Sequence, residues 1–124
     1  MAVDIEAYQG AQGEGRCIAY LRYLFPAYRW LNEELLNLTY NTCGAAKDLP
    51  AILGLKSLYQ PEGIVEINWD EALENVLSLL LHRDMIADDE LLREVVDIAE
   101  FVMKAYRLSL YNTGTEPVVI KWSA

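Results

Sequence analysis

Two apolar stripes with helical spacing constrain the fold more than any other feature of the sequence. In residues 69–83, large apolar side chains recur at the i, i+3, i+4 and i+7 positions of one helix face: Leu73, Val76, Leu77 and Leu80. Asn68 and Glu71 fit the two positions of a capping box at the start of this helix. Residues 88–111 carry a longer stripe: Leu92, Val95, Val96, Ala99, Val102, Met103 and Tyr106. We therefore expect two adjacent long helices.

The rest of the chain is also expected to be mostly helical. Pro26 divides the segment before Cys43 into helices near 14–25 and 26–42, because proline suits a first turn and breaks an interior. In the second of these, Leu31, Leu35 and Leu38 follow the spacing of one face. A short helix is expected near 49–58.

Two short segments, about 64–69 and 117–122, are rich in bulky apolar residues and are expected to form one short two-stranded β element. The glycine-containing segment 1–15 is expected to be a flexible N-terminal arm. At 124 residues the chain has the length of one domain, residues 1–124. The expected fold class is therefore mainly α, a compact domain of four to five helices.

Negative charge is concentrated in the two long helices and the segment before them. Residues 62–100 carry twelve acids and two bases, whereas the whole chain has a formal net charge of −9. Helix starts and solvated faces account for many of these acids. The surplus predicts a surface that attracts a basic partner and repels nucleic acid, so no direct nucleic-acid binding is expected.

An apolar content of 53% is high for a small domain, which has little interior. Some of these side chains are expected to be covered by another chain, either a partner protein or a second copy in a homodimer. No apolar stretch has the length of a membrane span, and no targeting segment is visible, so no membrane association and a cytoplasmic location are expected.

The residues give little support for cofactor, metal or catalytic chemistry. His82 is the only histidine, and Cys17 and Cys43 are too far apart in sequence for a CxxC motif, so no metal or cofactor is expected. Carboxylates near Asp70 or Asp84 could serve a small enzyme, but no recognisable catalytic motif surrounds them. We therefore expect a protein that is not an enzyme.

Two groups of residues are candidates for partner binding. The first combines aromatic side chains with arginine, the residue types that dominate binding hot spots: Tyr20, Arg22, Tyr23, Tyr28, Arg29 and Trp30. The second is the acidic stripe of the last long helix: Glu90, Glu94 and Asp97. The alternative is that aromatic residues of the first group fill the core, as such residues do more often than not.

Taken together, these features predict a small acidic protein that binds a basic site on another protein. An inhibitor, an immunity or antitoxin-like protein, or a phage anti-defence protein would have this character, and its acidic face could mimic nucleic acid. Two alternatives stay open: a homodimeric adaptor or secretion-type chaperone, and the small enzyme using Asp70 or Asp84.

Overall fold

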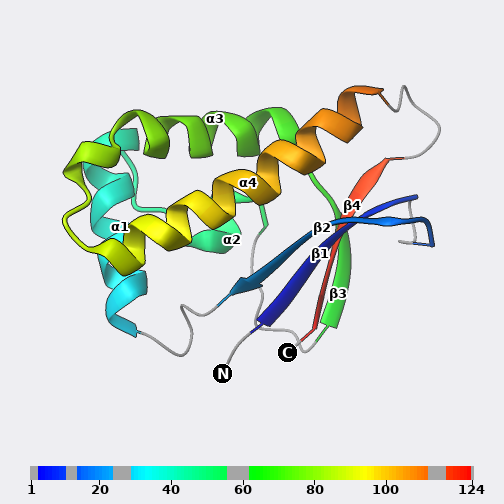
Figure 1. The fold of residues 1–124 in the computed structure, drawn as a ribbon, viewed down its shortest axis with the longest axis horizontal. Coiled ribbons are helices and arrows are strands. Elements are labelled where there is room, and N and C mark those ends of the chain that lie inside the picture. Colours follow the sequence, from blue (N-terminus) through cyan, green and yellow to red (C-terminus); the bar gives the residue numbers. More distant parts are fainter. Residues whose placement is uncertain (1–2, 11–13, 24–28, 56–61, 112–116, 124) are drawn as a thin grey trace.

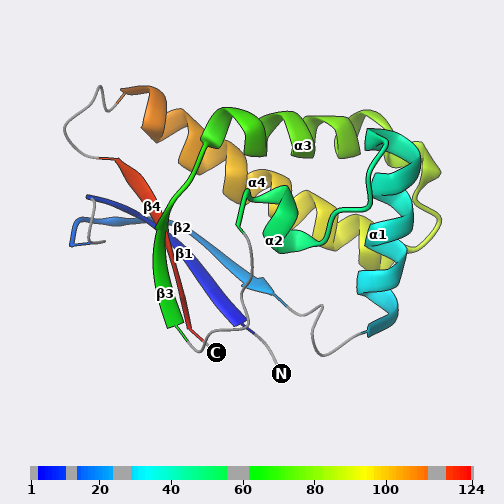
Figure 2. The same cartoon turned by 180° about the vertical axis from the view of Figure 1, so that it is seen from behind.

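The computed structural model describes residues 3–10, 14–23, 29–55, 62–111 and 117–123. Within them, four helices stand on one side of a four-stranded antiparallel sheet (Figures 1 and 2). The expectation of a mainly α domain is therefore wrong, and the fold is α+β. The elements in chain order are β1 (Val3–Gln9), β2 (Cys17–Tyr23), α1 (Arg29–Cys43), α2 (Leu49–Ile52), β3 (Glu62–Glu66), α3 (Trp69–Leu81), a 3-10 turn (Arg83–Met85), α4 (Asp89–Tyr111) and β4 (Val118–Ser123).

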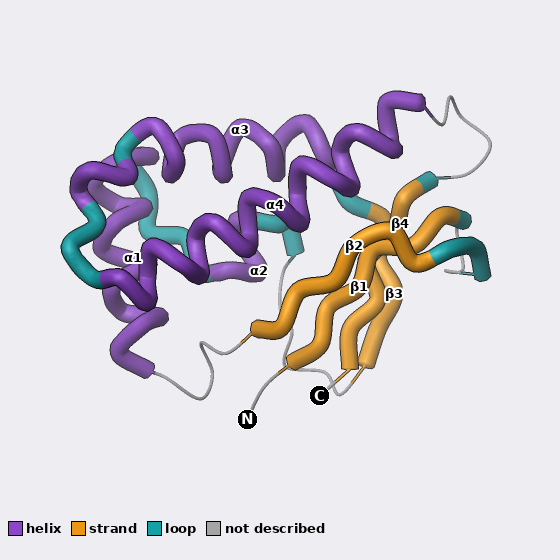
Figure 3. Tube along the Cα trace, viewed as in Figure 1, coloured by secondary structure: helices purple, strands orange, loops and turns teal. Residues whose placement is uncertain are grey.

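The strands follow the order β2-β1-β4-β3, so β2 and β3 form the two edges. The two expected segments do pair, since Ile64 of β3 lies opposite Lys121 of β4, but the expected two-stranded element is wrong because β4 also pairs with β1 in a four-stranded sheet. The expected strand was misplaced, however: β3 covers 62–66, and Trp69 already belongs to α3. Figure 3 shows the strands side by side, with the helices gathered on one side of them.

The N-terminal part of the chain differs most from expectation. Segment 1–15 is not an arm over its described length, because it contains β1, and the helix expected at 14–25 is replaced by β2. Along β1, buried Val3, Ile5 and Ala7 alternate with partly exposed Asp4, Glu6 and Tyr8. This period of two places one side of the strand against the core. β1 is stabilised by hydrogen-bonded strands on both sides, β2 and the distant β4.

The structure of helix α1 confirms the helical spacing predicted for its leucines. Leu31, Leu35 and Leu38 are all buried on one face, and the helix begins at Arg29. The residues between β2 and α1, including Pro26, lie outside the described part of the chain. At the start of α3, the side chain of Asn68 accepts a hydrogen bond of 3.2 Å from the backbone N–H of Glu71, so the predicted N-cap is confirmed.

The buried faces of α3 and α4 are rotated relative to those expected from the sequence. Leu77 of α3 and Val96 and Met103 of α4 are substantially exposed, whereas Asn75 and Phe101 are buried. The two helices pack against each other, and α4 also contacts β2. The buried face of α4 therefore packs against both the sheet and α3. Phe101 lies near Trp69 at the start of α3, with ring centroids 6.3 Å apart.

Candidate protein-binding groove

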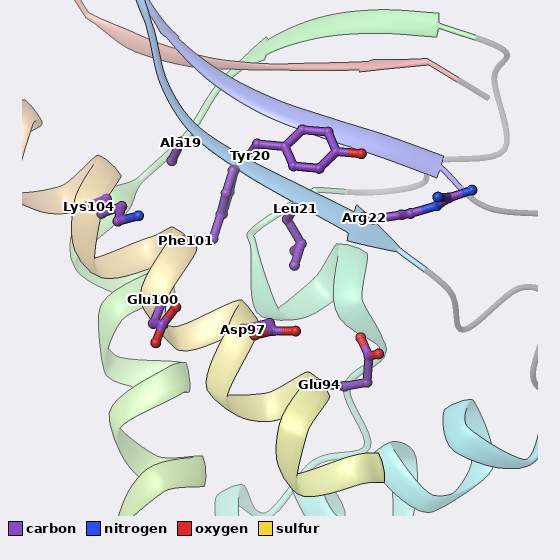
Figure 4. Close-up of a pocket in the computed structure, with 9 residues that line it drawn as sticks. All are labelled: Ala19, Tyr20, Leu21, Arg22, Glu94, Asp97, Glu100, Phe101 and Lys104. Atoms are coloured by element: carbon purple, nitrogen blue, oxygen red, sulfur yellow. The ribbon is translucent and has the colours of Figure 1, made fainter.

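A groove runs along the outer edge of β2, between this strand and α4 (Figure 4). Its strand side consists of four consecutive residues, Ala19, Tyr20, Leu21 and Arg22. Its helix side is a stripe of α4: Glu94, Asp97, Glu100, Phe101 and Lys104. The groove has a volume of about 280 Å³. That is close to the lower end of ordinary small-molecule pockets, roughly 300 Å³.

The strand and the helix run in opposite directions along the groove. Figure 4 shows Ala19 toward the end of the groove that holds Lys104, and Arg22 toward the end that holds Glu94. The buried side chains of Leu21 and Phe101 lie between β2 and α4 and form the apolar base. Core packing of these two side chains therefore fixes β2 and α4 relative to each other, while the charged residues at the rim of the groove reach solvent.

Charged side chains line the helical wall and both ends of the groove. Glu94, Asp97 and Glu100 project from α4, with Lys104 and Arg22 near the two ends. Among the described residues, none of these five side chains forms an ion pair within 4.0 Å. Their charges are therefore not neutralised by close partners in that part of the chain.

Glu94 is the half-buried member of this set, and its environment disfavours the carboxylate. Burial raises the pKa of Glu94 above its ordinary value, and repulsion from Asp97 raises it further, against the opposing effect of Arg93. Titratable groups with shifted pKa values occur often at functional sites, although structural networks also produce them. A basic group placed in the groove would offset both effects, because a nearby positive charge favours the carboxylate form of Glu94.

Tyr20 and Arg22 also belong to the face of the sheet opposite the helices. The Tyr20 hydroxyl donates a hydrogen bond to Oδ1 of Asp4 on β1, yet the tyrosine side chain remains more than half exposed. Asp4 lies opposite Arg22 in the β1–β2 register. Hydrogen bonding to Asp4 raises the pKa of the Tyr20 phenol above its ordinary value.

The structure brings together two candidate groups that the sequence left separate. Tyr20 and Arg22 from the aromatic segment line the same groove as Glu94 and Asp97 from the acidic helix. Glu90 lies in the first turn of α4 and does not line the groove, although its charge raises the pKa of Glu94.

Two other predicted contact residues, Arg29 and Trp30, do not line the groove. Arg29 and Trp30 are exposed at the start of α1, where Arg29 pairs with Glu33 at 3.3 Å. Tyr23 ends β2 opposite Val3, and Tyr28 lies outside the described residues. Of the described side chains in the aromatic segment, Tyr20 and Arg22 therefore line the groove, whereas Arg29 and Trp30 do not.

The other residues considered for catalysis or metal binding do not form a shared site among the described residues. Asp70 lies in the first turn of α3 and Asp84 in the 3-10 turn after this helix, and both are exposed. The ring Nδ1 of His82 is 2.9 Å from the carbonyl oxygen of Ser78, in the last turn of the same helix. Within the described residues, no group of His, Cys, Asp and Glu has a metal-binding arrangement.

Sequence reasoning missed a polar cluster on the open face of the sheet. The Tyr8 hydroxyl donates to Oε2 of Glu6 at 2.8 Å, and the Cys17 thiol lies 3.6 Å from the same oxygen. The Lys121 ammonium stands 4.8 Å from the centre of the Tyr8 ring. Hydrogen bonding to Glu6 raises the pKa of Tyr8 to about 12. The alternation of β1 was the signal that could have placed Glu6 and Tyr8 together.

Helices of the described part are either too short or too polar to cross a bilayer. No protein-family model matches the chain. Comparison with curated proteins and with solved structures likewise finds no match.

Proposed function

We propose that this protein is a non-catalytic binder of another protein and that it uses the groove between β2 and α4 to hold a basic segment. The observation that carries this proposal is the juxtaposition of an edge strand with three carboxylates whose charges have no close partner in the described residues. An inhibitor, an immunity or antitoxin-like protein, or a phage anti-defence protein would use such a site. The proposal keeps the expected cytoplasmic location, where Cys17 and Cys43, both free, would stay reduced.

The groove combines two contributions that protein interfaces commonly use. Tyr20 and Arg22 project from this edge strand on the face of the sheet opposite the helices, where they offer exposed contact area of the types enriched in binding hot spots. The carboxylates of Glu94, Asp97 and Glu100 supply attraction for a basic partner, which increases the association rate and makes it depend on salt. The apolar base supports both by fixing the distance between strand and helix.

A display library of natural protein fragments provides a direct test. The library is selected in parallel on the wild-type protein, on Asp97→Lys/Glu100→Lys, and on Glu34→Lys/Glu74→Lys. Both double variants change the net charge by +4, but only the first alters the groove, because Glu34 and Glu74 are exposed on α1 and α3 and do not line it. Circular dichroism checks that all three proteins are folded.

We expect basic fragments to be enriched on the wild-type protein and on the Glu34→Lys/Glu74→Lys control, and to be lost on the groove variant. Their association rates should fall at least tenfold between 50 mM and 500 mM salt, because rim charges are screened. Enrichment of the same fragments on all three proteins would refute the proposed site.

A homodimeric adaptor is the second candidate, and exposed apolar side chains on α3 and α4 favour it. Leu77 and Leu81 are four positions apart on α3, and Val96 and Met103 are seven positions apart on α4. Each pair therefore occupies one face of its helix. Leu81 is 73% exposed. Light scattering of the wild-type protein and of Leu77→Lys/Met103→Lys tests this function, which predicts a dimer that the variant dissociates. A monomer at every concentration measured would exclude it.

A further inference from the structure

We infer that the partner binds as an added β-strand: an extended segment pairs with the outer edge of β2 and directs basic side chains, at alternate positions, toward the carboxylates of α4. This inference rests on the proposed function and specifies its partner. It commits to an extended peptide segment of a protein, with a basic residue at every second position.

The first support is the state of the β2 edge. Within the described residues, β2 pairs with β1 on one side only, and no strand pairs with its other side. Alternate residues of an edge strand point their backbone N–H and C=O groups outward, where another strand can bind them. The groove follows four consecutive residues, Ala19 to Arg22, so it runs along this backbone edge and not beneath an isolated side chain.

The second support is the match in spacing between helix and strand. Glu94 and Glu100 are six positions apart, which corresponds to about 9 Å along a helix with a rise of 1.5 Å per residue. Side chains on one face of a strand recur every two residues, about 6.6–6.8 Å apart. Two or three basic side chains at alternate positions would therefore span the row formed by Glu94, Asp97 and Glu100.

The same charges disfavour a second copy of this chain as the occupant. Pairing between two β2 edges would add a second α4, with its own Glu94, Asp97 and Glu100, to one continuous sheet. Three further carboxylates would then face a site that already disfavours the Glu94 anion. A basic segment has the opposite effect, because it supplies counter-charges.

The other sheet edge offers a weaker site. The hollow beside β3 is lined by residues of β1, β3 and β4 alone, without a helix to form a wall. Glu62 and Glu66 flank Ile64 on this strand. If two copies paired antiparallel about Ile64, Glu62 would lie opposite Glu66 of the other copy, and like charges in that position are destabilising. Repulsion between these acids therefore opposes self-association through the β3 edge.

The test uses a synthetic seven-residue peptide, acetylated and amidated, that alternates valine with three lysines. Backbone N-methylation at each position in turn removes one N–H donor. In an added strand, only alternate residues point their N–H groups toward β2, so sensitivity to methylation should have a period of two. Affinity is measured by fluorescence polarisation, and amide exchange of residues 19–22 by nuclear magnetic resonance.

We expect at least a tenfold loss of affinity at alternate positions, little change at the positions between them, and slower exchange of outward-facing β2 amides when peptide is bound. Affinity should fall at least tenfold on Asp97→Lys/Glu100→Lys and should be retained on Glu34→Lys/Glu74→Lys.

The possible failures are distinguishable. If the peptide binds and requires the α4 carboxylates, but tolerates methylation at every position and leaves the β2 amides unchanged, strand addition is wrong while the proposed function stands. Failure of the peptide to bind at millimolar concentration also overturns strand addition, and the fragment selection then decides the proposed function independently. If the groove variant binds the peptide as well as the wild-type protein does, both are refuted.

Discussion

The indole Nε1 of Trp69 donates a buried hydrogen bond of 3.0 Å to the carbonyl oxygen of Val118. This bond joins the first residue of α3 to the first residue of β4, which are 49 positions apart in sequence. Both residues are buried, and the Trp69 ring also lies near Phe101 of α4. Trp69 therefore connects the helical layer to the sheet at the point where two helices and a central strand meet.

We expect Trp69→Phe to lower the free energy of unfolding by about 1–3 kcal/mol, because it leaves the Val118 carbonyl without its donor and removes packed volume. Urea unfolding followed by circular dichroism measures this. Trp30→Phe is the matched control, since Trp30 is 42% exposed and should change stability by about 0.5 kcal/mol or less. Equal effects of the two variants would contradict the role assigned to Trp69.

Gly63 and Trp122 make a second close contact, on β3 and β4. A Cβ atom at Gly63 would collide with ring atoms of the Trp122 indole, which lies opposite it in the strand register. Gly63→Ala should therefore destabilise the fold by about 1–3 kcal/mol through overpacking. In a Trp122→Leu background, Gly63→Ala should lower the free energy of unfolding by less, because the indole ring with which the Cβ atom collides is absent. Thermal unfolding of the four proteins in this cycle measures the coupling, and strict additivity would show that the collision is not the cause.

Glu94 makes stability depend on pH in a specific direction. Its pKa is raised above the ordinary value of 4.5, chiefly by burial, so folding favours the protonated form. The stability this contributes is fully present below about pH 4.5 and is lost as the pH rises through the raised pKa. We therefore expect Glu94→Gln to be more stable than the wild-type protein at pH 7 and equal to it at pH 3. Urea unfolding at the two pH values tests this, with exposed Glu34→Gln as the control.

The same substitution should weaken binding of a basic peptide, because it removes one of three groove carboxylates. A gain in stability combined with a loss of affinity would show that the Glu94 charge serves binding at the expense of folding. A loss of stability at pH 7 would contradict the environment described for this carboxylate.

Cys17 should react slowly with alkylating reagents. Burial raises the pKa of its thiol, and the hydrogen bond to Glu6 raises it further, so less of the reactive thiolate is present near neutral pH. In a Cys43→Ser background, iodoacetamide labelling across pH 7–10 should give a midpoint above the ordinary thiol value. Glu6→Gln should lower that midpoint and speed labelling at pH 8, whereas Glu62→Gln on β3 should leave both unchanged. A midpoint at or below the ordinary value would refute this account.

Much of the helical layer could be predicted from the sequence because its signals are local. The leucines of α1, the Asn68 cap of α3 and the extent of α4 all depend on residues within a few positions of one another. The sheet was missed although β1 alternates clearly, since buried and open positions follow each other from Val3 to Tyr8. The glycines between β1 and β2 favoured a flexible arm instead, and the residues of β2 were included in the helix expected at 14–25.

The candidate groove could not be assembled from sequence spacing. The residues Tyr20 and Glu94 are 74 positions apart, and each had been assigned to a different surface. They line one groove because β2 is an edge strand and α4 packs against it. Even the exact faces of α3 and α4 depended on this arrangement, as burial of Phe101 and exposure of Met103 show.

The sequence by itself determined where the long helices lie, how α3 begins, and that negative charge gathers in residues 62–100. These properties follow from local hydrogen bonding, side-chain periodicity and the identity of the side chains. Only the tertiary structure decided that β1 and β4 pair in the centre of a sheet, that β2 is left at its edge, and that three carboxylates of α4 stand beside it. Strand pairing joins segments more than 100 residues apart, so no local pattern in either segment specifies its partner.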